Sequence, residues 1–416
     1  MAHRNPVILG YDLVSPLGTE LGVQWERAAR GESGVGRLTR FSLTNDFPVR
    51  IAGEVAEIDT APYPFLSPRS LALWPSPLFK YALLVAHRAL AASGVVIGPE
   101  LAPRVAVTFS SAIGGLDAVL AADRRMIAEG KLPPPYANPN SCINMVGGKI
   151  AMLTGATGPI TATITACATG VTSMIVGGML LEAGRADVAV CGAADFALVE
   201  PIVAGFATMN GAYQARPGQA DDPPARASRP FSIDRRGFVV SEGAGCVVLA
   251  TPAFARAHGL APAFEIAGWS MTSDAHHFVA PHLKTVAACM AGCIDNAGIR
   301  PHDVAAVNAH AASTKVGDAV EHQALTRVFG ERIPPVSANK SLIGHAMGAA
   351  SAIESILAME GMRRETLLPT INYAPDPELP LDCVAEGARP LAQEFVLKNS
   401  FGFGGCNACM ILHRIA

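Results

Sequence analysis

Cys167 is the residue with the clearest potential for chemistry in this sequence. It lies in the run ITATITACATGVTSMIVGGMLLEAG, where β-branched residues at 160–165 predict a strand and the small and apolar residues after them predict a helix. A thiol at such a turn faces the unpaired N–H groups of the helix start, whose partial positive charge favours the thiolate. The position therefore predicts a nucleophile with a lowered pKa, more reactive than the other eight cysteines, which we expect to be buried as small hydrophobic residues.

Two histidines and a glycine-rich run extend this chemistry. His310 ends a predicted strand, His345 precedes a predicted helix, and the run SFGFGG at 400–405 follows another strand. Neutral imidazoles that donate N–H groups to a thioester carbonyl stabilise an enolate and support decarboxylation. Backbone N–H groups of the glycine-rich run, with that of Cys167, can form an oxyanion hole. The set indicates acyl transfer followed by enolate chemistry.

The elements that must position these residues occur twice. Strand-like and helical runs alternate along the chain, which is typical of an α/β protein. Five runs return in the same order, so we infer an internal duplication with halves at 1–255 and 256–416, Cys167 in the first and His310 and His345 in the second. A pseudo-twofold axis would bring the helix starts at Cys167 and His345 face to face. The matched runs are 7–16 with 264–273, a helix at 81–93 with one at 285–298, 105–114 with 304–313, the segment of Cys167 with that of His345, and 187–196 with 396–405. The proline-rich stretch at 205–232 predicts a surface loop inserted in the first half.

Composition excludes several classes of protein. A length of 416 residues with 50% hydrophobic content supports a large core, and a net charge of −3 argues against a general nucleic-acid binder. No apolar run is long enough to predict a membrane span or a signal peptide. The nine cysteines contain a single C-x2-C pair, Cys406 and Cys409, so we predict no metal site and a reducing, cytoplasmic location.

Five motifs, in order along essentially the whole chain, resemble the elongating β-ketoacyl-acyl-carrier-protein synthases of types I and II. They are TACATG around Cys167, RPFSIDRRGFVVSEGAG at 229–245, VNAHAAST around His310, NKSLIGHAMGAA around His345 and NSFGFGGCNA at 399–408. The resemblance implies a thiolase-like fold, in which two pseudo-duplicated halves form a layered α-β-α-β-α core. It also implies a homodimer, or a heterodimer with a related subunit. The expected partner is an acyl-carrier protein whose phosphopantetheine carries the substrates, with no other cofactor.

The resemblance implies a role for each matching residue. Cys167 is the acylated nucleophile, while His310 and His345 bind the malonyl thioester and support its decarboxylation. Lys340 precedes the second histidine by five residues, and Glu354 has apolar neighbours, so we expect it to be buried and paired with Lys340. Further residues are expected around the substrate, with Phe403 as the gate whose N–H joins Cys167 in the oxyanion hole and with Ile113, Ala137, Thr314 and Phe401 binding substrate.

Some positions depart from the family pattern. Ala312 replaces a threonine whose hydroxyl contacts pantetheine in relatives, and Cys406 replaces another threonine. Ala137 stands where type II synthases carry a phenylalanine at the floor of the acyl pocket, across the dimer interface, so we predict acceptance of longer or stiffer acyl chains. Few cations are available for an acidic carrier in the segment 67–81, which keeps Arg69 and Lys80; Arg124, Arg125 and Lys131 are candidates to compensate.

Three other functions remain to be weighed. A chain-length-factor-like or non-condensing partner subunit would keep the fold, but such subunits characteristically lack the nucleophile, which is present here with both histidines. A biosynthetic thiolase would lack the GHAMGAA and NSFGFGG runs. A non-catalytic assembly subunit would tolerate loss of Lys340 or His345. The expected reaction is decarboxylative Claisen condensation with a malonyl-acyl-carrier protein, and fatty-acid, polyketide and aryl polyene synthesis all remain open as its pathway.

Overall fold

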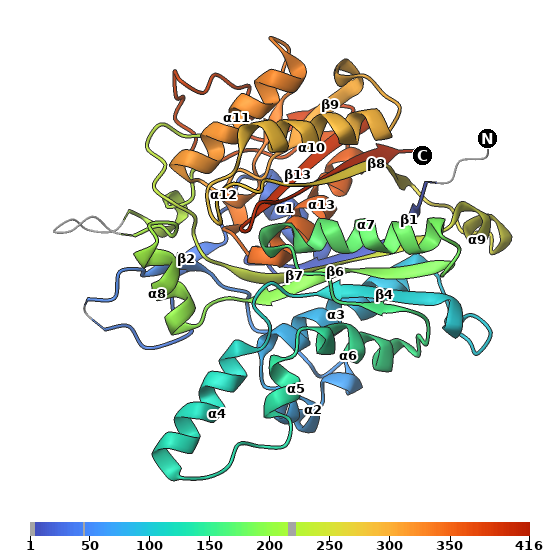
Figure 1. Ribbon diagram of the computed structural model, residues 1–416, viewed down its shortest axis with the longest axis vertical. Coiled ribbons are helices and arrows are strands. Elements are labelled where there is room, and N and C mark those ends of the chain that lie inside the picture. The colour runs from blue at the N-terminus through green and yellow to red at the C-terminus, as the bar shows by residue number, and fades with distance from the viewer. Residues whose placement is uncertain (1–4, 45, 215–221) are drawn as a thin grey trace.

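The computed structural model describes residues 5–44, 46–214 and 222–416, and it confirms the predicted α/β fold. Most strands of the described residues join a ten-stranded sheet in the order β10-β9-β13-β14-β8-β1-β7-β6-β4-β5 (Figure 1). The strands β1, β4, β5, β6 and β7 of the first half correspond, in that order, to β8, β9, β10, β13 and β14 of the second. With this correspondence the strand order reads the same from both edges of the sheet. The bounds are β1 (Val7–Val14), β4 (Val105–Ser110), β5 (Ile160–Thr161), β6 (Val188–Phe196), β7 (Glu242–Ala250), β8 (Phe264–Ser273), β9 (Val304–Asn308), β10 (Val336–Ser337), β13 (Phe395–Gly402) and β14 (Cys406–Arg414).

Strand directions repeat in the same way in the two halves. β4 pairs in parallel with β5 and β6, and β9 pairs in parallel with β10 and β13, whereas β7 and β14 are antiparallel to their neighbours. The halves meet between β1 and β8, which share only the pairs Val7 with Glu265 and Ile8 with Phe264. Such a repeated set of strands is what an internal duplication requires. The predicted boundary near residue 255 falls inside α9 (Pro252–Ala257), and the division at that point stays a prediction.

Helices lie in three layers around the sheet. α3 (Pro77–Ser93) and α6 (Asn144–Thr154) cover the outer face of the first half, and α10 (Leu283–Asn296), with α11 (Lys315–Phe329) beside it, covers the second (Figure 1). Between the halves lie α7 (Thr169–Glu182) and α13 (Met347–Arg363), where Val171 donates its backbone N–H to Ser351 Oγ at 3.2 Å. Helix α13 carries small and apolar residues on all its sides, so it is buried from Met347 to Met362. The core therefore has the expected α-β-α-β-α layers.

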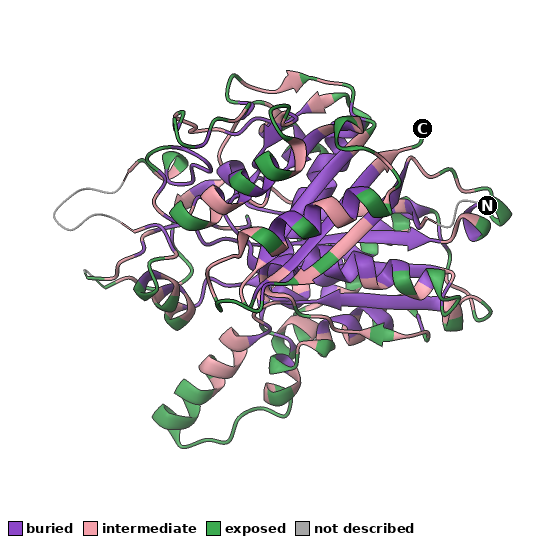
Figure 2. Cartoon of the chain, turned by 45° about the horizontal axis from the view of Figure 1, so that its top comes forward, coloured by how far each residue is buried: buried purple, intermediate pink, exposed green. Residues whose placement is uncertain are grey.

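One part of the molecule projects from this core. α4 (Leu116–Glu129) and the segment that leads to α5 (Ala137–Ser141) are largely exposed, as Figure 2 shows. Within the described residues, no helix has both the length and the apolar character needed to cross a bilayer. The remaining elements are short, namely α1 (Leu21–Ala29), α2 (Pro68–Leu73), α8 (Glu200–Thr208), α12 (Lys340–Ile343), a small sheet of β2 (Val35–Arg37) with β3 (Ile51–Gly53), and another of β11 (Thr366–Leu367) with β12 (Arg389–Pro390).

Two predictions about local structure are wrong. The strand before Cys167 spans only Ile160–Thr161, because Thr165 leaves the sheet and bonds forward, its N–H to Thr169 Oγ1 at 3.1 Å and its hydroxyl to Thr172 Oγ1 at 2.8 Å. The predicted loop at 205–232 begins inside α8 and ends in the core, where residues 227–232 are buried and Phe231 donates its N–H to Asp318. Residues 215–221 of that stretch lie outside the described residues. The helix predicted at 81–93 starts earlier, because Pro77 suits the first helical turn.

Candidate active site

Cys167 lies in a short 3-10 turn, Ala166–Ala168, that leads into the central helix α7. Ala166, directly before it, has a left-handed backbone with φ of 48°, a conformation that costs a residue other than glycine free energy. Thr169 holds this turn, since its hydroxyl donates to the Ala166 carbonyl at 2.7 Å. The turn places the thiol at the start of α7, as predicted, with 8% of the residue exposed.

His345 approaches the thiol from the other half of the chain. Its Nε2 lies 3.1 Å from Cys167 Sγ. Gly344 precedes it with φ of 70°, and a Cβ there would lie 2.9 Å from the Val239 carbonyl oxygen, so this turn requires glycine. The backbone of His345 is held on both sides, because its N–H donates to Val239 O at 2.7 Å and its carbonyl accepts from the N–H of Ser241 at 3.0 Å. The predicted meeting of the two helix starts is confirmed.

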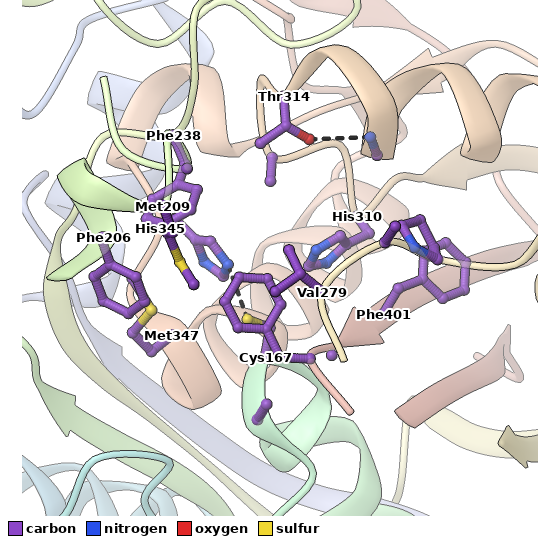
Figure 3. Close-up of a pocket in the computed structure, with 18 of the residues that line it drawn as sticks. Cys167, Phe206, Met209, Phe238, Val279, His310, Thr314, His345, Met347 and Phe401 are labelled. Carbon is purple, nitrogen blue, oxygen red and sulfur yellow. Dashed lines mark hydrogen bonds between the residues drawn. The ribbon is translucent and has the colours of Figure 1, made fainter. Parts of the chain in front are cut away.

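His310 completes the group at the end of β9. Its ring centroid lies 5.6 Å from that of His345, with the planes at 81°, and 5.7 Å from that of Phe401. Figure 3 shows Cys167, His310 and His345 converging on one cavity. Two groups hold the His310 backbone: its N–H donates to Glu321 Oε1 at 2.9 Å, and its carbonyl accepts from Lys340 Nζ at 2.6 Å.

Both imidazoles are neutral in this environment. Burial, followed by the positive charge of Lys340, lowers the pKa of His310 and of His345 well below the usual value. A neutral ring with one N–H suits the predicted role of a hydrogen-bond donor that gives up no proton. The expectation of neutral imidazoles is therefore confirmed.

The predicted lowering of the Cys167 pKa is wrong. Burial raises the pKa of the thiol to about 12, since desolvation outweighs the lowering by Lys340 and by the N–H of Phe403. A helix start acts over its first turn with a modest energy, whereas complete burial of a thiolate costs several times more. The free protein therefore holds Cys167 as a thiol.

The turn after β13 lies against the nucleophile. A Cβ at Gly402 would lie 2.2 Å from the Thr165 carbonyl oxygen and 3.2 Å from the Cys167 nitrogen, so only glycine permits this approach. It brings the backbone N–H of Phe403 to the sulfur, where a hydrogen bond from that N–H opposes the rise in the Cys167 pKa. The N–H groups of Phe403 and Cys167 thus lie close to where an oxyanion would form.

A cavity of about 1000 Å³ opens onto these residues. Four predicted residues line it with the cysteine and both histidines: Ile113, Thr314, Phe401 and Phe403. Phe206 and Met209, from the stretch predicted to be a loop, and Phe238, which follows that stretch, add apolar wall (Figure 3). Thr314 also caps α11, since its Oγ1 accepts from the Gly317 N–H at 3.2 Å. Ala137 starts α5 and does not line this cavity within the single chain.

Behind the histidines lies a fully buried set of charges. The predicted ion pair is confirmed, with Lys340 Nζ 2.6 Å from Glu354 Oε1. The sequence analysis missed Lys398, whose Nζ lies 2.7 Å from the other oxygen of Glu354, and Glu321, which supports the His310 backbone. A lysine inside the apolar run of β13 was the available signal, because charged residues are almost never fully buried without a partner.

Asp195 is a third residue that was not predicted from the sequence. It ends β6 next to the cavity wall and accepts hydrogen bonds from Ser111 Oγ at 2.5 Å, from the N–H groups of Ala112 and Ile113 at 3.0 Å each, and from the N–H of Ala349 at 3.1 Å. Burial raises the pKa of this carboxyl to about 6, because all four donors are neutral groups. Asp195 therefore ties the wall at Ile113 to the start of α13.

One expectation about the surface needs correction, and another stays a prediction. Cys142 is exposed and Cys406 is partly exposed, so the eight other cysteines are not all buried. The cations proposed to contact a carrier already have acidic neighbours: Arg124 lies 2.9 Å from Glu200, and Glu129 lies 3.2 Å from Arg125 and 2.9 Å from Lys131. Exposed pairs of this kind are weak, so they can exchange for a partner's carboxylates.

Comparison with known proteins decides the family. Residues 4–255 match the domain described as "Beta-ketoacyl synthase, N-terminal domain", and residues 263–374 match "Beta-ketoacyl synthase, C-terminal domain". The chain belongs to the β-ketoacyl synthase family. It is 34% identical to the 3-oxoacyl-[acyl-carrier-protein] synthase 2 of Coxiella burnetii, with 100% of each chain covered. The family consists of condensing acyltransferases, and this chain is one of them.

Solved structures agree with this assignment. A β-ketoacyl synthase from Burkholderia phymatum matches this β-ketoacyl synthase with a TM-score of 0.91 at 29% identity, covering 100% of both chains. The ishigamide ketosynthase/chain length factor matches with a TM-score of 0.90, also at 29% identity and over 100% of both chains. The thiolase-like fold implied by the sequence motifs is confirmed.

Proposed function

We propose that this β-ketoacyl synthase joins an acyl group, carried on Cys167, to malonyl-acyl-carrier protein and releases a 3-oxoacyl-acyl-carrier protein and CO₂. The strongest support is the 3.1 Å contact between Cys167 Sγ and His345 Nε2, with a second neutral imidazole beside it in one cavity. A nucleophile and two hydrogen-bond donors are what this condensation needs.

The first step loads the enzyme. Cys167 Sγ attacks the carbonyl carbon of an acyl-phosphopantetheine thioester, and the pantetheine sulfur leaves with the thiol proton. The N–H groups of Cys167 and Phe403 bind the oxyanion of the tetrahedral intermediate. Since burial keeps the free cysteine as a thiol, His345 beside the sulfur supports its deprotonation only when the carbonyl is in place.

The second step makes and uses an enolate. His310 and His345 donate N–H groups to the malonyl thioester carbonyl, the bond to the carboxylate breaks, and its electron pair forms the enolate as CO₂ leaves. The enolate carbon attacks the acyl carbonyl on Cys167, and the Cys167 sulfur leaves as thiolate and regains a proton. Lys340 positions His310, because its ammonium holds the carbonyl of that residue at 2.6 Å.

The partners we propose are an acyl-carrier protein and a second copy of this chain. β5 ends the sheet, and Ile160 in this strand and Ile164 after it are exposed, so two copies could pair there and bury apolar surface. Met126 and Ile127 on the projecting helix α4 are exposed as well. A heterodimer with a related subunit is the alternative, and the similarity to a ketosynthase/chain length factor supports keeping it.

The cellular location and the biosynthetic pathway are proposed separately from the reaction. We propose the cytoplasm, where the nine free cysteines stay reduced. Fatty-acid, polyketide and aryl polyene synthesis share this catalytic set, so a panel of acyl groups on defined carriers is the measurement that distinguishes them. A non-condensing partner subunit is the second candidate function, and the intact Cys167, His310 and His345 make it the weaker one.

Intact-mass spectrometry with an acyl-carrier thioester tests the proposal. We expect the wild type to gain one acyl group and Cys167→Ser to lose transfer. His345→Ala and His310→Ala should keep some transfer but lose malonyl decarboxylation, because only that step builds enolate charge. Condensation by His345→Ala at the wild-type rate, or acylation elsewhere than Cys167, would contradict the mechanism.

A further inference from the structure

Lys398 is a buried cation that the reaction steps above do not use. It lies on β13, three residues before Phe401, with its side chain fully enclosed. Its Nζ donates to Glu354 Oε2 at 2.7 Å and to the Asn399 carbonyl oxygen at 2.8 Å. Burying a lysine costs free energy unless an opposite charge pairs with it, so the surrounding charges must account for Lys398.

The reason lies in the balance of buried charges. Glu354 is shared between two ammonium groups, Lys340 on Oε1 and Lys398 on Oε2. A second carboxylate, Glu321, is buried nearby and accepts from the Asn399 side chain at 3.0 Å. Two cations and two carboxylates therefore form a neutral group under the histidines. Without Lys398 the group would carry one net negative charge.

That negative charge would act on the two catalytic rings. A carboxylate in a low-dielectric site favours the protonated form of a nearby imidazole, and a protonated ring cannot serve as a neutral donor. The positive charge of Lys398 lowers the pKa of His310 and of His345, after the larger effects of burial and Lys340. Besides Cys167 and the two rings themselves, the ionisable groups here are Lys340 of α12, Glu354 of α13, Glu321 of α11 and Lys398 of β13.

We propose that Lys398 is a positioning residue that keeps His310 and His345 neutral, so that both remain hydrogen-bond donors to the malonyl thioester as the pH falls. The inference rests on the proposed function of these two histidines. Lys398 touches no substrate and acts through Glu354 and the field that it shares with Lys340. It also fixes the Asn399 carbonyl, which anchors the strand that leads to the oxyanion turn.

A double-mutant cycle of Lys398→Met and Glu321→Gln tests the inference. The readouts are the acid limb of kcat/KM for malonyl decarboxylation and the titration of the histidine ring signals by NMR. Lys398→Met should raise the midpoint of the acid limb and the midpoints of the ring titrations by about one pH unit, which is within the range by which a nearby charge shifts a pKa. Lys398→Arg, which keeps the charge, should leave both close to wild type. Glu321→Gln should move both downward, and the double variant should restore them.

The cycle separates the possible failures. A folded Lys398→Met protein with wild-type acid limb and ring titrations overturns the inference. If that variant does not fold, the comparison of Glu321→Gln with the double variant measures the same Lys398 effect, and an absent difference there overturns it equally. A wild type that decarboxylates no malonyl thioester at any pH contradicts the proposed function instead, while the ring titrations still decide the role of Lys398.

Discussion

Asp195→Asn should change how stability depends on pH. Burial raises the pKa of Asp195 to about 6 from an ordinary 3.8, so the folded protein binds a proton that the unfolded chain has released. Protonated Asp195 therefore contributes stability that is fully present below pH 4 and is lost as the pH rises through 6. Each pKa unit corresponds to 1.36 kcal/mol, so the complete change is about 3 kcal/mol.

The part of this change in the free energy of unfolding that can be measured lies between pH 5 and pH 8. With folded and unfolded pKa values of about 6 and 3.8, linkage gives a loss of about 1.4 kcal/mol in the free energy of unfolding over this interval. Asparagine cannot titrate, so the variant lacks this term. It also turns an NH₂ group toward one of the backbone donors of Asp195, for example the N–H of Ala349, and that mismatch costs roughly 1–3 kcal/mol at every pH.

Urea unfolding of both proteins at pH 5 and pH 8, at one protein concentration, is the assay. The wild type should exceed Asp195→Asn in stability by about 1.4 kcal/mol more at pH 5 than at pH 8. Asp303→Asn is the control: its hydrogen bond with Arg300 lowers the pKa of Asp303 to about 2, so its difference from wild type should be the same at both pH values. A pH-independent difference for Asp195→Asn would refute the raised pKa.

Two further outcomes are expected. Limiting alkylation with a neutral reagent, followed by peptide mapping, should modify exposed Cys142 before Cys167, because burial raises the pKa of the Cys167 thiol; the reverse order would restore the lowered pKa first predicted from the sequence. Ala137→Phe should shift the preference toward shorter acyl chains while short-acyl transfer to Cys167 continues, because in the proposed homodimer the added ring would refill the floor of the acyl pocket. A chain-length panel checks this, and an unchanged profile would remove position 137 from the pocket.

The sequence by itself determined the family and the repeated order of elements, and it indicated the candidate catalytic residues. Cys167, His310 and His345 could be chosen because each stands at the junction of two elements, and junctions follow from local patterns of β-branched, small and glycine residues. The order of repeated runs implied a pseudo-twofold axis, and the axis implied that the starts of α7 and α13 meet. Glu354 could be placed inside the core because apolar residues surround it in sequence as well as in space.

Only the tertiary structure decided the electrostatics. Desolvation depends on everything packed around a group, so the thiol of Cys167, expected to be acidic at a helix start, has a raised pKa instead. The charged partner of Lys398 and the hydrogen-bond donors of Asp195 lie far away in the chain, so no local sequence pattern predicts these contacts. The same holds for the wall at Phe206, which lies in a stretch predicted to be a surface loop but belongs to α8 and lines the cavity.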